Sequence, residues 1–201
     1  MKKTLIIAAL FLSGCAAMTP TRENVKGFKV YDIPSAPTPQ LSRALAQSIK
    51  TAMQQYSSDV DISQKIPPSP LPEKATRYEV INPLQNATGL MALAAQAGGG
   101  AFEIPRCQGS VLDVTSHRNY AGFENTTFFV CLIPYQKGYS LNVYYSFTRI
   151  TGGFSTASLG NQLAQSMVGS TGQYIPKTIA DIESSVTAQG LPLVTVDGYP
   201  N

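Results

Sequence analysis

The segment TTFFVCLIP at 126–134 constrains the fold more than any other part of the chain. It has no charged residue, and both of its alternating faces are apolar, which is typical of a central β-strand that is covered on both sides. The pattern predicts three consecutive strands, at 108–116, 126–135 and 140–150. The Gln-Lys-Gly sequence at 136–138 suits a short hairpin between the last two. We therefore expect an antiparallel sheet at the centre of the fold.

The strand predicted at 140–150 alternates in polarity. One face carries Leu141, Val143, Tyr145 and Phe147, and the other carries Asn142, Tyr144, Ser146 and Thr148. Because successive side chains of a strand point to opposite faces, the first set predicts a core face. The second set predicts a face that is wet or contacts a partner.

Amphipathic segments flank this β-rich centre. Helical spacing of apolar residues predicts a helix from Pro39, capped by Thr38, to about Gln55, and two more at 155–168 and 176–189. Gly190 suits the C-cap of the last one. Further strands are expected at 27–33, 75–82 and 191–198. The order predicts an α+β fold, an antiparallel sheet of about four or five strands with helices mainly on one face.

An apolar, glycine-rich insertion at 84–103 interrupts this pattern. Its segment Ala87–Phe102 is apolar on nearly all sides and contains three consecutive glycines at 98–100. It is too short to span a membrane. Two interpretations stay open, a mobile lid or insertion that meets lipid or a partner, and a small helix packed across the core.

The N-terminus has the layout of a secretory signal. Lys2 and Lys3 precede an apolar run at 4–12, and small residues then lead to Cys15. The run is too short to cross a hydrocarbon core of about 30 Å as a helix.

The four residues Leu12-Ser13-Gly14-Cys15 match the lipobox at every position, so the chain resembles the bacterial lipoproteins. The resemblance implies cleavage before Cys15 and lipid attachment to it. It thus implies a signal peptide at 1–14, a lipidated flexible tether at 15–26 and one periplasm-facing domain at 27–201. Ala16, in place of an aspartate, implies the outer membrane of a Gram-negative cell.

The charge balance excludes a nucleic-acid-binding protein. The formal charge is +3, and only 13% of residues are charged. Loss of Lys2 and Lys3 with the signal peptide leaves 13 basic and 12 acidic residues, a net charge of +1. No basic stripe remains to follow a phosphate backbone.

Cys107 and Cys131 remain as an even pair, which in an exported chain suggests a disulfide. A simple hairpin about 120–123 would place Cys131 opposite Leu112, about 16 Å along the strand from Cys107. Bridged Cα atoms must lie within about 7 Å. The disulfide therefore requires Arg106 and Cys107 to fold back, or the two strands to be unpaired. The alternative is two separately buried thiols.

The sequence predicts no enzyme, no metal site and no cofactor. His117 is the one histidine, so a three-histidine metal site is impossible, and no zinc-protease, nucleophile-elbow or phosphate-loop motif occurs. Ser116 would point to the opposite face of its strand from His117. A Cys131–His117 thiol pair is the remaining catalytic hypothesis, that of a cell-wall or thiol hydrolase. Asp59 and Asp61 are expected in a solvated loop.

Aromatic residues at the strand connections suggest a binding surface, formed by Tyr120, Phe123, Tyr135 and Tyr139. Ordinary packing is the alternative. We expect a non-enzymatic accessory or assembly component of an envelope protein complex, attached to the membrane by its lipid. A lipoprotein that binds a small apolar or lipidic ligand between sheet and helices is the second hypothesis.

Overall fold

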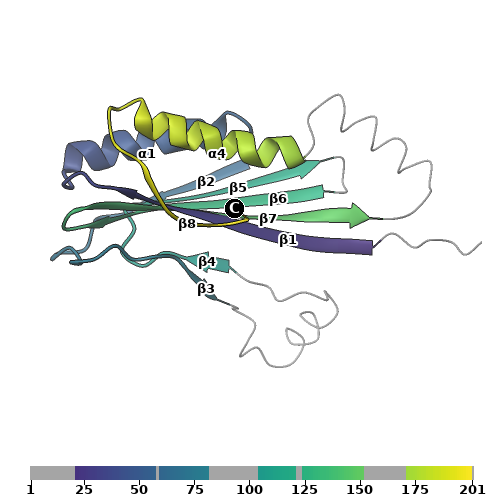
Figure 1. Ribbon diagram of the computed structural model, residues 1–201, viewed down its shortest axis with the longest axis horizontal. Helices are drawn as coiled ribbons and strands as arrows, with labels where there is room; N and C mark the ends of the chain where they lie inside the picture. Colours follow the sequence, from purple (N-terminus) through teal and green to yellow (C-terminus); the bar gives the residue numbers. More distant parts are fainter. Residues whose placement is uncertain (1–20, 58, 82–103, 121–123, 152–170, 201) are drawn as a thin grey trace, which may run out of the picture.

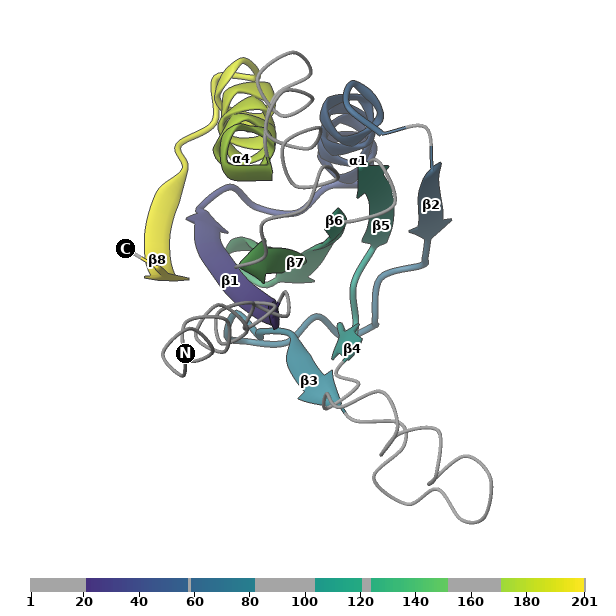
Figure 2. The same cartoon turned by 90° about the vertical axis from the view of Figure 1, so that its right-hand side faces the viewer.

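The computed structural model describes residues 21–57, 59–81, 104–120, 124–151 and 171–200, and within them the chain forms three layers (Figure 1). Two helices cover one face of a six-stranded sheet, and a two-stranded sheet lies against the other face (Figure 2). Every strand pairing is antiparallel. The expected α+β class and the helix-covered face are confirmed, with six strands in the main sheet instead of four or five.

The elements follow one another in this order: β1 (Thr21–Ile33), α1 (Pro39–Gln54), β2 (Asp59–Gln64), β3 (Glu79–Ile81), β4 (Ile104–Arg106), β5 (Leu112–Tyr120), β6 (Glu124–Tyr135), β7 (Gly138–Thr151), α4 (Thr171–Thr187) and β8 (Val194–Tyr199). The main sheet has the strand order β2-β5-β6-β7-β1-β8, and β3 pairs with β4 in the small sheet. The segment TTFFVCLIP lies in β6, at the centre of the main sheet, as its two apolar faces predict.

The main core lies between this sheet and the two helices. Thr38 caps α1 as expected, since its hydroxyl accepts the backbone N–H of Leu41 at 3.1 Å. The apolar face of α1 and of α4 is fully buried at Leu45, Ile49 and Ile182. These side chains pack against the even-numbered residues of β6, Phe128, Val130 and Leu132.

A second, smaller core lies on the opposite face of the sheet, between the main sheet and the layer of β3 and β4 (Figure 1). Cys107, Cys131 and Ile133 form its centre, with Tyr78 and Phe129 packed against them. The Tyr78 ring makes edge-to-face contacts with Phe28 and Tyr144, with ring centroids 6.1 Å and 5.7 Å apart. The face of β7 that was expected to be wet or to contact a partner is therefore covered, at Asn142 and Tyr144, by the chain's own second layer.

The N-terminal part of β1 corrects the expected tether. Residues 21–26, predicted as flexible, pair with β7 from Thr21 opposite Thr151 to Lys26 opposite Ser146. The physical reason is the length of β7, which has 14 residues. The backbone groups of its last residues, 146–151, need hydrogen-bond partners, and residues 21–26 of β1 provide them.

Three other boundaries differ from the expectation. Asp59 and Asp61 lie on β2, where they pair with β5, and not in a loop. β5 begins at Leu112, because residues 107–111 form the turn that connects it to β4 in the other layer. α4 begins at Thr171, before Pro176, and burial of Tyr174 and Ile175 supports this first part of the helix.

The last helix ends as predicted, since Gly190 adopts a positive φ of 73° after it. The expected terminal strand is β8, paired with β1. The apolar segment Ala87–Phe102 and the helix expected at 155–168 lie outside the described residues.

Replacement of Ile182 by alanine tests the packing of α4 on the sheet. Ile182 is fully buried, so the Ile182→Ala variant should lose about 2–5 kcal/mol of unfolding free energy in urea. The matched control is Ile66→Ala, because Ile66 is 92% exposed and its loss should change stability by less than about 0.5 kcal/mol. Equal effects at the two positions would contradict the described core.

Candidate functional site

A disulfide between Cys107 and Cys131 joins the two sheets. Cys107 directly follows β4, and Cys131 lies in β6, with a Cα–Cα distance of 6.4 Å. Both residues are buried. The structure thus contains the expected disulfide, and it forms by the fold-back route, because Cys107 belongs to the second layer and approaches β6 from the face of the sheet opposite the helices (Figure 1).

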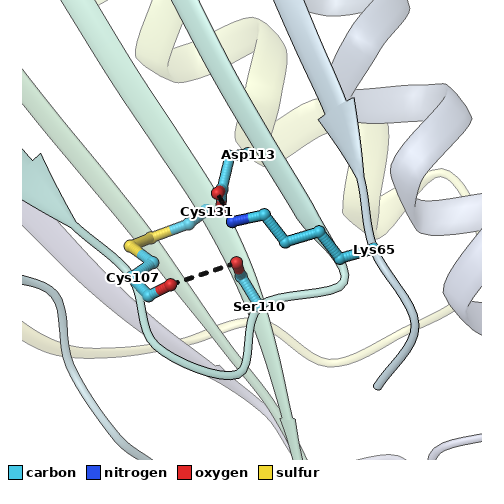
Figure 3. Close-up of polar contacts among 5 residues, drawn as sticks. All are labelled: Lys65, Cys107, Ser110, Asp113 and Cys131. Carbon is cyan, nitrogen blue, oxygen red and sulfur yellow. Dashed lines mark hydrogen bonds and ion pairs between the residues drawn. A yellow bond between two sulfur atoms is a disulfide. The ribbon is translucent and has the colours of Figure 1, made fainter. Parts of the chain in front are cut away.

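A tight turn follows Cys107 and brings the chain back to the main sheet. Gly109 has a positive φ of 72°, a conformation that favours glycine. The Ser110 hydroxyl donates to the Cys107 carbonyl at 3.3 Å (Figure 3). The turn therefore fixes the position of Cys107 relative to β5.

An acidic residue lies beside the two sulfur atoms. Asp113 of β5 pairs with Cys131 of β6, so the two side chains share a face. A carboxylate oxygen of Asp113 and the two sulfur atoms all lie within 4.8 Å of one another. Asp113 Oδ2 forms an ion pair with the Lys65 ammonium (Figure 3). Asp113 Oδ1 is buried and has no hydrogen-bond partner among the described residues.

A backbone hydrogen bond fixes the position of Lys65 beside β5. The Lys65 N–H donates to the Val111 carbonyl at 3.0 Å, directly after β2 ends. The side chain of Lys65 is 45% exposed, whereas that of Asp113 is 15% exposed. The cluster therefore has one polar side that reaches solvent through Lys65 and one buried side that faces the disulfide.

Tyrosine hydroxyls in the same layer are kept protonated. The Tyr135 hydroxyl donates to Asp32 Oδ1 at 2.7 Å, and burial together with this carboxylate raises the pKa of Tyr135 to about 12. Burial, with Tyr144 nearby, raises the pKa of Tyr78 to about 12. Both side chains therefore stay neutral donors near neutral pH.

The described residues of the expected binding surface lie at opposite ends of the main sheet. Tyr135 and Tyr139 lie at the β6–β7 hairpin and are buried, and the Tyr139 hydroxyl lies 2.8 Å from Ser42 Oγ. Tyr120 ends β5, at the opposite end of the 12-residue β6, about 37 Å away along the strand. Phe123 and the side chain of Tyr120 lie outside the described residues, as does the lipidation residue Cys15.

His117 lies at one end of the sheet, beside a cavity of ≈ 640 Å³. The cavity is lined by Tyr56, Ser57, Asp59, His117, Arg118, Asn125, Thr126 and Thr127. His117 Nδ1 lies 3.1 Å from Thr127 Oγ1. Cys131 pairs with Asp113, and Asp113 lies four residues from His117, about 13 Å along β5. Cys131 is also bonded to Cys107. The structure therefore does not bring Cys131 to His117.

The sequence pattern did not indicate Asp113 or Lys65 as site residues. The expected hairpin placed Cys131 opposite Leu112, one residue from its actual partner. A shift of one residue moves every side chain of a strand to the other face, so this small error hid the carboxylate. The available signal was polarity, because Asp113 is the one charged residue between Leu112 and Ser116.

In the described ranges, no helix has both the length and the apolar character needed to cross a bilayer.

Removal of both cysteines tests the mechanical role of the disulfide. The bond closes a loop with a sequence separation of 24, so the Cys107→Ala/Cys131→Ala variant should lose about 3–4 kcal/mol of unfolding free energy in urea. Trypsin should also cleave faster at Lys74 and Arg77, which lie in the layer that the bond holds. Ser110→Ala keeps the bond and serves as control. An unchanged urea midpoint and cleavage rate in the double variant would show that the layer is held by packing alone.

No protein-family model and no curated protein matches this chain. Among solved structures, an uncharacterised protein from Rhizobium leguminosarum matches at 9% identity, over 82% of this chain and 99% of the other, with a TM-score of 0.26. A similarity at this level carries no conclusion about fold or function.

Proposed function

We propose that the chain is a lipid-anchored envelope protein that binds a partner protein by adding a strand of that partner along β8, without catalysis. The observation that carries the proposal is the exposed apolar edge of the main sheet. β8 is the last strand in the sheet order and pairs on one side with β1. Its large apolar side chains Val194, Val196 and Tyr199 are 51%, 54% and 62% exposed.

Exposed edge strands are usually protected, because their free backbone groups can pair with another chain. The segment 194–199 contains no lysine, arginine or proline, the residues that commonly block such pairing. A register shift opposite Val30 and Tyr31 is the protective feature present in this strand pair. An apolar edge with little protection favours strand addition by a partner with apolar residues at alternating positions.

The other face of β8 is tied to the second layer. Arg77 donates to Asp197 Oδ2 at 2.6 Å, and this guanidinium lowers the pKa of the Asp197 carboxyl. The contact links the segment before β3 to the edge strand. A partner on the outer edge would therefore meet a strand that is already fixed in position.

The lipobox sets where this edge would lie. If Cys15 carries lipid, Phe28, which pairs with Tyr199 of β8, lies 13 residues further along the chain and at most about 45 Å from the anchor. The strand edge would then face the periplasm close to the membrane. This placement suits an accessory component of a membrane-attached complex.

The apolar-ligand hypothesis receives less support from the described residues. Between sheet and helices the core side chains Leu45, Ile49 and Leu132 are fully buried and pack against one another. The cavity of ≈ 640 Å³ lies at the His117 end of the sheet and has a mainly polar lining. Apolar ligands bind in mainly apolar cavities.

Photo-crosslinking in intact cells tests the proposed edge. A photoreactive residue placed at position 196 should give a discrete adduct with one partner protein, whereas the same residue at position 47, on the exposed side of α1, should not. The substitution Val194→Asp should remove the adduct by placing a charge in the interface, while Ile66→Asp should leave it unchanged.

The anchor is tested in the same cells. Cys15→Ser removes the acylation site, so the protein should leave the membrane fraction. An adduct at position 196 that survives Val194→Asp, or equal labelling at positions 47 and 196, would contradict docking at β8. Retention of the Cys15→Ser variant in the membrane would contradict the anchor alone.

A further inference from the structure

The cluster around the disulfide combines three metal-binding side chains from the two layers. Cys107 comes from the end of β4, Cys131 from β6 and Asp113 from β5, and their donor atoms lie within 4.8 Å of one another. The two cysteines are buried, and Asp113 is mostly buried. The register of the sheet and the turn at Gly109 already hold these donors together, before any metal binds.

We infer that the reduced chain binds one zinc-like divalent cation through Cys107 Sγ, Cys131 Sγ and the Asp113 carboxylate. Thiolates select soft or borderline metals, and a carboxylate completes many zinc sites. In a tetrahedral zinc site the donor atoms lie about 3.5–3.8 Å apart, given the usual zinc–ligand distances. Breaking the S–S bond lets the two sulfur atoms separate toward this distance. The inference does not depend on the proposed role of β8.

The orientation of Asp113 supports this assignment. Its Oδ2 is held by Lys65, whereas its Oδ1 is buried without a hydrogen-bond partner among the residues described. A buried oxygen without a partner is costly, and ligation of a cation removes that cost. Metal-binding carboxylates usually carry a second contact that orients them, and Lys65 supplies it.

The charges of the cluster also balance. Two thiolates and one carboxylate carry three negative charges, which a divalent cation and the Lys65 ammonium neutralise together. A buried group of charges is tolerated when it is neutral as a whole.

Reduction followed by metal binding converts the disulfide-linked form of the cluster into a metal-linked form. A dithiol reductant breaks the Sγ–Sγ bond by exchange, becomes a disulfide itself and leaves two thiols on the chain. Binding of the cation then releases the two thiol protons. The disulfide and the metal are thus alternative links between the same two layers, and each excludes the other.

Cobalt and zinc titrations of the full chain test the site. The protein is purified in detergent, reduced with a phosphine under nitrogen, and freed of reductant. We expect one equivalent of Co²⁺ to bind with thiolate-to-cobalt charge-transfer absorption and Zn²⁺ to displace it, whereas the oxidised protein should show no such absorption. If reduction unfolds the chain, Zn²⁺ should restore the circular dichroism of the oxidised protein.

Variants separate the site from chance binding by two thiols. Asp113→Asn should weaken Co²⁺ binding at least about tenfold. Asp61→Asn, an exposed aspartate on the neighbouring strand β2, should leave the affinity unchanged. Cys107→Ala should abolish the absorption. The inference is overturned if the reduced wild type takes up no cobalt, if Asp113→Asn binds as tightly as wild type, or if zinc does not refold a chain unfolded by reduction.

Discussion

The burial of β6 on both faces is the interaction on which the rest of the structure depends. Its even-numbered residues Phe128, Val130 and Leu132 pack under the helices, and Cys131 and Ile133 pack under β3 and β4. Burial of one such side chain stabilises the fold by about 1.5–3 kcal/mol, so the strand contributes to two cores at once. A three-layer fold of this kind requires an uncharged strand at its centre, and TTFFVCLIP is that strand.

The sequence predicted well those features that depend on local patterns. Thr38 with Pro39 marks the start of α1, Gly190 marks the end of α4, and the alternation at 140–150 identifies the core face of β7. Each of these signals arises from the backbone or from neighbours within a few residues. They can therefore be interpreted from the sequence without the tertiary structure.

Features that depend on contacts between distant segments could not be predicted in this way. The register that places Asp113 beside Cys131, the pairing of 21–26 with β7, and the strand at 59–64 all depend on which edges the fold leaves open. Likewise, Tyr139 is buried in the main core, and its hydroxyl contacts Ser42 of α1, 97 residues away in sequence. The periodicity of a segment predicts whether a residue faces a polar or an apolar environment. It does not predict which residue of another segment will contact it.

Three parts of the molecule therefore differ in what they contribute. The helix-covered core stabilises the sheet, the disulfide links the second layer to β6, and β8 is an exposed edge strand of the main sheet. In our proposals the anchor and β8 set where the protein acts and what it binds, while the Cys107–Asp113–Cys131 cluster links the state of the second layer to redox conditions and metal. The two proposals concern different residues and can fail independently.

Native-state hydrogen exchange on the oxidised protein tests the central claim, that β6 is the most deeply held strand. We expect the backbone amides of Val130, Cys131 and Leu132 to exchange only through global unfolding, with protection that falls steeply as urea is added. Amides of the edge strands β2 and β8 should exchange by local opening, with little urea dependence. Exchange of the β6 amides as fast as those of β2 and β8 would contradict the account.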